Sequence, residues 1–141
     1  MSDTHPPRFW HELVVRYADT DAQGHVYFAN YLTFFDEGLT GYLHAVGFPP
    51  QSWLDEGVDV VCAHVESSYA GRAFFEDRLR VGVRITRWGT TSFNVSCSVQ
   101  RRDATIAEGQ LVQVCVDADS METRPYPRSF REAVEAFEAS G

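Results

Sequence analysis

A short polar stretch near the N-terminus carries the side chains best suited to chemistry. Asp19 and Asp21 stand two residues apart, and His25 follows four residues after Asp21. A carboxylate held in a tight turn before a helix lies where partial positive charge accumulates. An ionisable group placed between a strand and an apolar helix is a natural candidate for catalysis. The alternative is that these aspartates only cap a turn.

The residues around these acids resemble a known family signature. Residues 19–31 read Asp-Thr-Asp-x-x-Gly-His-Val-x-Phe-x-Asn-Tyr. Further segments that carry the resemblance are 75–81, 86–93, 107–109 and 114–117. In this order and spacing they resemble hotdog-fold acyl-CoA thioesterases of the 4-hydroxybenzoyl-CoA thioesterase family, over roughly residues 10–128. The match covers nearly the whole chain.

The resemblance assigns roles to residues of the acidic stretch. In the family the second acid of the motif is the catalytic carboxylate, which is Asp21 in this chain. It would act as a nucleophile on the thioester carbonyl or as a general base toward water. Tyr17 and His25 occupy positions where some members hold a tyrosine or a histidine near the acid. A core aromatic and a loop hydrogen bond are the respective alternatives.

Other residues are expected to support the acid or to line the substrate site. Asp19 would orient the loop through hydrogen bonds to backbone N–H groups. One branch of the family places a histidine where this chain has Phe28, and another branch uses a glutamate from a different element, for which Glu66 is the candidate. The residues expected to contact substrate are Gly24, Val26, Phe28, Asn30, Tyr31 and Glu66.

Arginines are the candidates for binding the phosphates of coenzyme A, because guanidinium groups recognise phosphate with paired hydrogen bonds. The four candidates are Arg72, Arg87, Arg101 and Arg102. An ordinary solvated sheet surface is the alternative. Coenzyme A enters as part of the acyl-CoA substrate, and no separate cofactor is expected. Asp19, Asp21 and His25 have no second cluster to complete a metal shell, so no metal is expected.

Composition excludes several classes of function. The net charge of −8 argues against a nucleic-acid partner, which requires a basic face. No apolar run approaches the roughly 18 residues of a membrane span. The N-terminal stretch lacks the basic and apolar regions of a signal peptide, so a cytoplasmic protein is expected. The three cysteines are expected to be buried, reduced thiols; they are Cys62, Cys97 and Cys115.

Hydrophobic periodicity predicts the order strand, long helix, four strands, short helix. Asn30 is the expected N-cap of the long helix, and Ser129 with Glu132 forms an expected capping box for the last one. The apolar stretch near 111–116 suggests that the fifth strand is central. The expected elements are a strand at 9–18, a helix at 30–46, a loop at 51–57, strands at 58–69, 79–85, 93–99 and 105–117, and a C-terminal helix from 129.

This order predicts an α+β class: one curved antiparallel five-stranded sheet wrapped around one long helix, plus a short C-terminal helix. The resemblance implies that 1–141 forms a single hotdog thioesterase domain. Gly38 and Gly41 interrupt the long helix, either because a sheet wraps it closely or because a buried helix tolerates them. Exposed edge strands need protection, and pairing into a homodimer would supply it. In the family, dimers or dimers of dimers (homotetramers) place active sites at the subunit interface.

The sequence thus predicts an acyl-CoA thioesterase that releases a free carboxylic acid and coenzyme A, with Asp21 as its carboxylate. Two alternatives remain open. In one, acyl carrier protein carries the acyl group in place of coenzyme A; in the other, the chain is a non-catalytic hotdog module that binds acyl-CoA.

Overall fold

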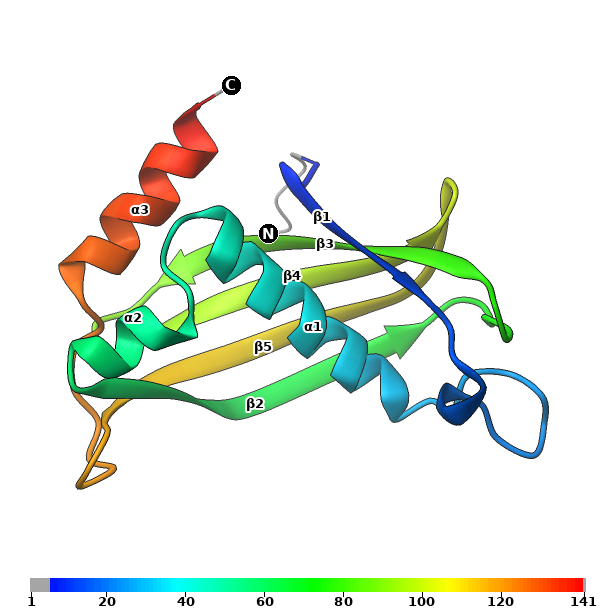
Figure 1. The fold of residues 1–141 in the computed structure, drawn as a ribbon, viewed down its shortest axis with the longest axis horizontal. Helices are drawn as coiled ribbons and strands as arrows, with labels where there is room; N and C mark the ends of the chain where they lie inside the picture. Colours follow the sequence, from blue (N-terminus) through cyan, green and yellow to red (C-terminus); the bar gives the residue numbers. More distant parts are fainter. Residues whose placement is uncertain (1–5, 141) are drawn as a thin grey trace.

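Five antiparallel strands form one curved sheet that wraps around a long helix in the computed structural model, which describes residues 6–140 (Figure 1). The strand order is β1-β3-β4-β5-β2, and every neighbouring pair is antiparallel. This confirms the predicted α+β class. The elements are β1 (Phe9–Val14), η1 (Tyr17–Asp19), α1 (Asn30–Ala45), α2 (Pro50–Asp55), β2 (Val58–Tyr69), β3 (Arg78–Trp88), β4 (Ser92–Arg101), β5 (Ala104–Asp117) and α3 (Arg128–Ala139).

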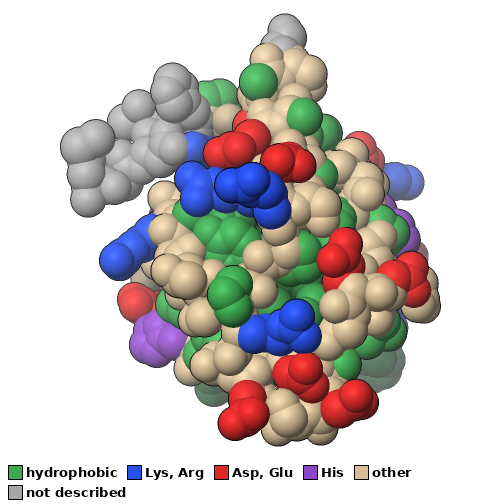
Figure 2. All heavy atoms as spheres, turned by 90° about the vertical axis from the view of Figure 1, so that its left-hand side faces the viewer, with side chains coloured by type: hydrophobic (Ala, Val, Ile, Leu, Met, Phe, Trp, Pro, Cys, Tyr) green, Lys and Arg blue, Asp and Glu red, His purple; other side chains and the backbone are tan. Residues whose placement is uncertain are grey.

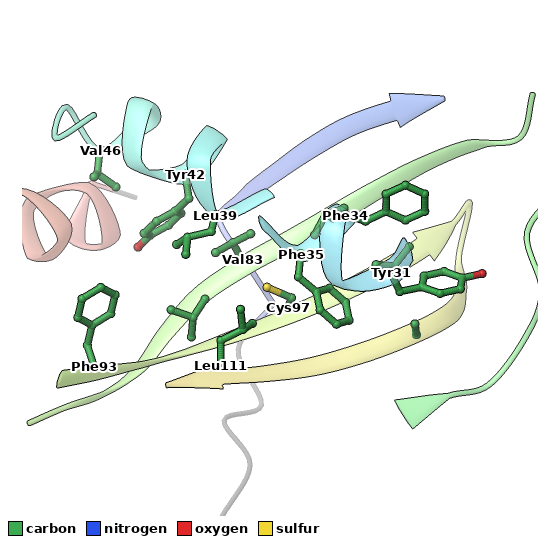
Figure 3. Close-up of a cluster of buried hydrophobic side chains, with 14 of the residues drawn as sticks. Tyr31, Phe34, Phe35, Leu39, Tyr42, Val46, Val83, Phe93, Cys97 and Leu111 are labelled. Atoms are coloured by element: carbon green, nitrogen blue, oxygen red, sulfur yellow. The ribbon is translucent and has the colours of Figure 1, made fainter. Parts of the chain in front are cut away.

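The apolar stripe of α1 forms the centre of the core, as its periodicity predicts. Tyr31, Phe35 and Tyr42 are buried on the side of the helix that faces the sheet. Figure 3 shows Phe35 beside Cys97 in the middle of this cluster, with Tyr42 at one end of it and Tyr31 at the other. Burial of this stripe holds the start of α1, and the loop that leads into it, in a fixed position on the sheet.

The two helix glycines are explained by close packing against the sheet. A Cβ atom at Gly38 would lie 2.7 Å from Val81 Cγ1, closer than real Cβ atoms come to their neighbours. At Gly41 the added atom would lie 3.0 Å from His11 Nδ1. The absence of side chains therefore lets α1 approach β1 and β3. Of the two explanations that the sequence leaves open, close wrapping is the one that applies.

The structure departs most from the predicted elements in two places. The first strand ends at Val14 rather than continuing to residue 18, because the Arg16 N–H donates to Asp19 Oδ2 and residues 17–19 fold into the 3₁₀ helix η1. Tyr17 consequently lies in a 3₁₀ turn. The expected loop at 51–57 contains helix α2, which starts with proline at its first position and buries Trp53.

Both predicted helix caps are wrong. The N-cap of α1 is Ala29, whereas Asn30 lies inside the helix and donates its side-chain Nδ2 to Asp19 O at 2.8 Å. The N-cap of α3 is Pro127, whose fixed φ suits the turn into a helix, so Ser129 caps no backbone group there. The α3 helix still packs its apolar face on the core, as expected, through the buried side chains of Phe130 and Val134.

Strand β2 lies at one edge of the sheet and β1 at the other, so β5 is an interior strand between β4 and β2, as its apolar sequence predicted. Cys97 and Cys115 are buried as predicted, but Cys62 is exposed because it lies on edge strand β2. No helix among residues 6–140 is long and apolar enough to cross a membrane. The end of the molecule seen in Figure 2 mixes basic and acidic side chains around apolar ones.

Candidate active site

Asp19 is the anchor of the loop that precedes α1. Its carboxylate is buried and accepts hydrogen bonds from the Arg16 backbone N–H at 2.8 Å and from Arg16 Nη2 at 2.9 Å. Its carbonyl oxygen accepts from Tyr27 N at 3.0 Å and from Asn30 Nδ2 at 2.8 Å. Asp19 therefore ties both ends of the loop together, which agrees with the orienting role predicted for it.

Neighbouring groups stabilise the ionised form of the Asp19 carboxyl group. Burial by itself would raise the pKa of this carboxyl group, but hydrogen bonds from the Arg16 side chain and backbone, together with the Arg16 charge, outweigh it. The net result is a pKa below the ordinary value of an aspartate. Asp19 is thus an ionised structural group with its oxygens already engaged.

Asp21 lies in a turn in which both its backbone N–H and its backbone C=O form hydrogen bonds. Its N–H donates to His25 O at 3.0 Å, and its C=O accepts from Gly24 N at 2.9 Å. The side-chain oxygen Oδ1 accepts from Gln23 N at 2.8 Å, as in a turn-capping aspartate. Within residues 6–140, Oδ2 of Asp21 has no hydrogen-bond or ion-pair partner. One carboxylate oxygen is fixed and the other is open.

The residues that follow Asp21 pair with the segment before β3. Gly24 adopts a φ of 86°, which glycine reaches without strain and which closes the turn. Val26 is buried and donates its N–H to Ala73 O at 2.9 Å. His25 Nδ1 lies 3.1 Å from Val26 O, and a hydrogen bond there requires the proton on Nδ1. The other ring nitrogen, Nε2, is then a potential proton acceptor.

Two backbone N–H groups at the start of α1 have no acceptor. The N–H groups of Asn30, Tyr31 and Leu32 donate to carbonyl oxygens three residues earlier. Those of Phe28 and Ala29 have no hydrogen-bond acceptor in the described part of the chain. Free N–H groups beside a helix N-terminus are suited to a developing negative charge, which is the property an oxyanion site requires.

Exposed aromatic side chains surround this loop. Tyr17 is 77% exposed and lies edge-on to Phe75, with ring centroids 5.9 Å apart. It is therefore not the core aromatic that a strand position would have made it. Tyr69 at the end of β2 donates its hydroxyl to Phe28 O at 3.0 Å. The large exposed side chains at this end of the molecule are Tyr17, Tyr27, Phe28, Tyr69, Phe74 and Phe75.

The other predicted substrate contacts divide between the core and the surface. Tyr31 is buried in the first turn of α1 and packs on Tyr69, with ring centroids 5.4 Å apart. Phe28 is 60% exposed and lies at the surface of the loop. Glu66 is exposed on β2, where its Oε1 lies 3.2 Å from His64 Nε2. Within one chain, Glu66 points to solvent and has no contact with Asp21 among the described residues.

Three of the four candidate arginines lie at one end of the sheet. Arg101 Nη1 donates to Arg72 O at 2.8 Å and pairs with Asp77 Oδ2 at 2.9 Å, so its guanidinium is committed to the turn before β3. Arg102 follows it and is exposed. Arg87 lies seven residues along β3 from Arg80, roughly 23 Å away at the rise of a strand. It is not part of this group.

A basic pocket near the loop contains two arginines that the sequence reading did not select. Its volume is about 660 Å³, and Arg78 and Arg80 line it together with Arg101 and Arg102. The register of β3 against β4, which pairs Arg80 with Gln100, brings them together. No pattern in the sequence encodes that register. Among residues 6–140 no group of His, Cys, Asp and Glu side chains has the arrangement of a metal site.

Comparison with known proteins gives the family. A sequence model of the thioesterase-like superfamily matches residues 15–134. The 1,4-dihydroxy-2-naphthoyl-CoA hydrolase of Synechococcus elongatus is 26% identical over 123 residues, which cover 86% of this chain and 90% of that protein. The acyl-CoA thioester hydrolase YbgC of Escherichia coli is 32% identical over 116 residues, which cover 82% of this chain and 87% of that one.

Solved structures agree on the fold. The structure of 1,4-dihydroxy-2-naphthoyl-CoA thioesterase from Synechocystis superposes with a TM-score of 0.83 at 24% identity, over 92% of this chain and 97% of that one. The sheet, the long helix and the loop before it therefore form the hotdog fold that the sequence resemblance implies, and the chain belongs to the thioesterase-like superfamily.

Proposed function

We propose that the protein hydrolyses acyl-CoA thioesters to a free carboxylic acid and coenzyme A, with Asp21 as the reacting carboxylate. The observation that carries this proposal is the state of Asp21: a rigid turn fixes its backbone and Oδ1, while Oδ2 is open. Membership of the thioesterase-like superfamily supports it, as do relatives named as hydrolases of CoA thioesters.

The proposed chemistry needs few groups, because a thiolate with a conjugate-acid pKa of about 8.5 leaves readily. In one route Asp21 Oδ2 attacks the thioester carbonyl carbon, the C–S bond breaks, and coenzyme A leaves as its thiolate. Water then hydrolyses the mixed anhydride. In the other route Asp21 takes a proton from a water molecule that attacks the same carbon. Both routes place negative charge on the carbonyl oxygen, which the free N–H groups of Phe28 and Ala29 would stabilise.

The nucleotide of coenzyme A is assigned to the basic pocket. Arg78 and Arg102 have no ion pair among the described residues, whereas Arg101 is held by Asp77. Phosphate recognition is local, so it is compatible with a net charge of −8. Glu12 and Glu76 also line the pocket, and their carboxylates would partly offset the attraction of the arginines for a phosphate.

A homodimer that joins two β2 edges is the proposed assembly. Strand β2 has 12 residues, and no strand of the described chain pairs with its outer edge. A long unpaired edge strand is a template for a second copy. Val65 on β2 is 39% exposed and Tyr69 is 44% exposed, so the dimer would also cover apolar surface.

The assembly is measurable by light scattering after size-exclusion chromatography. We expect a particle of twice the chain mass of 15.9 kDa, or four times that mass for a dimer of dimers. A monomer at micromolar concentration would contradict the edge-pairing proposal.

Release of free thiol from a panel of acyl-CoAs tests the activity. We expect the protein to release coenzyme A from at least one of short, long and aromatic acyl-CoAs at micromolar to millimolar substrate. Turnover on acyl carrier protein thioesters but on no CoA thioester would move the proposal to that carrier. Tight binding of acyl-CoA without turnover of either class would favour a binding module and would contradict the enzyme.

A further inference from the structure

One side-chain hydrogen bond links the end of strand β2 to the start of helix α1. The Tyr69 hydroxyl donates to Phe28 O at 3.0 Å, across 41 residues of sequence. The Tyr69 ring also makes edge-to-face contacts with Tyr31, at 5.4 Å between ring centroids, and with Phe28, at 6.3 Å. Figure 1 shows the end of β2 beside the start of α1. A residue of the sheet therefore holds the loop backbone at the point where the helix begins.

Tyr69 has a fixed position of its own. It forms the last pair of the β2–β5 ladder, opposite Ala107. The next two residues, Ala70 and Gly71, donate their N–H groups to Ile106 O at 2.8 and 3.2 Å. Side chains supported by a strand hold their positions more precisely than side chains on a loop. The hydroxyl thus passes the position of the sheet on to the loop before α1.

The hydrogen bond acts on a peptide group that the proposed chemistry uses. Phe28 C=O and Ala29 N–H belong to the same peptide group, and in a trans peptide these two bonds point in opposite directions. Holding Phe28 O toward Tyr69 therefore directs the Ala29 N–H to the other side, where it has no acceptor among residues 6–140. The helical bond to Phe28 O, from Tyr31 N, is long at 3.4 Å, so Tyr69 supplies the shorter of the two contacts.

We propose that Tyr69 is a positioning residue for thioester hydrolysis. Its hydroxyl holds the Phe28–Ala29 peptide so that the Ala29 N–H is directed at the carbonyl oxygen of the substrate. This inference rests on the proposed function and deepens it. Donation to Phe28 O also polarises the peptide group, which makes the Ala29 N–H a stronger donor. The N–H group contributes most when negative charge develops on the carbonyl oxygen, so loss of its orientation lowers kcat more than it changes KM.

Tyr69→Phe tests the role, because it removes the hydroxyl and keeps the ring that packs on Tyr31. Thiol release from short, long and aromatic acyl-CoAs gives kcat and KM on the substrate that wild type turns over best. We expect kcat to fall about tenfold to a hundredfold, less than the roughly 10²–10³ lost with an oxyanion donor, because the N–H is still present. KM should change by less than about threefold. Full kcat in a folded Tyr69→Phe protein would overturn the inference and leave the proposed function intact.

Tyr126→Phe is the matched control. The Tyr126 hydroxyl also donates to a backbone carbonyl, Gly89 O at 2.6 Å, but at the opposite end of the sheet from the Asp21 loop. Because this bond is more buried, its loss should shift the urea midpoint at least as far as Tyr69→Phe does. Its kcat should stay within about twofold of wild type. Equal falls of kcat in the two variants would show that Tyr69 acts only through stability.

NMR of the free protein tests the orientation without turnover. In Tyr69→Phe the carbonyl ¹³C signal of Phe28 and the amide ¹⁵N signal of Ala29 should both shift, because their peptide group loses a hydrogen bond. In Tyr126→Phe both signals should stay in place. Unmoved signals in Tyr69→Phe would overturn the inference even for an inactive protein. Absence of thiol release by wild type from every acyl-CoA would instead refute the proposed function, and the catalytic part of the inference would fall with it.

Discussion

Asp21→Asn is expected to lower kcat for acyl-CoA hydrolysis by about a thousandfold or more. A carboxamide keeps the size of the side chain and its Oδ1 acceptor for Gln23 N, so the turn should remain closed. It lacks the negative charge that attacks the thioester or takes a proton from water. General-base catalysis alone accounts for roughly 10²–10⁴ in rate, and loss of a nucleophile costs at least as much. KM for the acyl-CoA should change little.

The control is Asp119→Asn, the same substitution at an exposed aspartate between β5 and α3. It should leave kcat within about twofold of wild type, since surface substitutions away from a site have small effects. Thiol release at saturating substrate gives kcat, and circular dichroism checks the fold of both variants. Undiminished turnover in a folded Asp21→Asn protein would remove Asp21 from the mechanism and leave the fold assignment untouched.

The fold was predictable because its signals are periodic. Alternation of apolar and polar residues from Leu79 to Ile85 fixes which face of β3 is buried, and the spacing of Tyr31, Phe35 and Leu39 does the same for α1. Such patterns span whole elements, so single exceptions do not erase them. This explains why the order of the five strands and of helices α1 and α3 was right, while the six-residue helix α2 was missed and the ends of elements were displaced.

The errors at Asn30 and Tyr17 arose where local hydrogen bonds of a polar side chain replaced the structure that the pattern predicted. Asn30 has the side chain of a good N-cap, but it donates to the carbonyl of Asp19 instead of accepting from its own helix. Tyr17 continues the alternation of the first strand. The hydrogen bonds between Asp19 and Arg16 instead fold residues 17–19 into a 3₁₀ helix, which leaves the tyrosine exposed. Local hydrogen bonds of this kind compete with the periodic pattern and are not encoded by it.

The candidate site was predictable only in part, since much of it depends on contacts between distant segments. The acidic loop is continuous in sequence, and its motif is readable. The grouping of Arg78 with Arg102 depends on the β3–β4 register, and the hydrogen bond from the Tyr69 hydroxyl to Phe28 O depends on the place of β2 beside the loop. Neither is a property of any short stretch of the chain.

Gly109→Ala is expected to lower the free energy of unfolding by about 3 kcal/mol, near the upper end of the usual cost of overpacking a core. A Cβ atom at Gly109 on β5 would lie 2.7 Å from Phe35 Cζ, and Phe35 is fully buried on α1. To relieve this clash the buried ring must leave its rotamer, or α1 must move away from the sheet. Urea denaturation at one fixed protein concentration measures the change.

Two comparisons tie that loss to the contact between α1 and β5. Gly71→Ala places its Cβ atom 3.3 Å from the flexible Ile106 Cδ1, and it should cost less than about 1 kcal/mol. In a Phe35→Leu background the cost of Gly109→Ala should fall by at least about 1 kcal/mol, because the shorter side chain removes the clash. Equal costs in both backgrounds would contradict the packing account. Since α1 begins directly after the Asp21 loop, a displaced helix should also lower kcat in Gly109→Ala while Gly71→Ala keeps full activity.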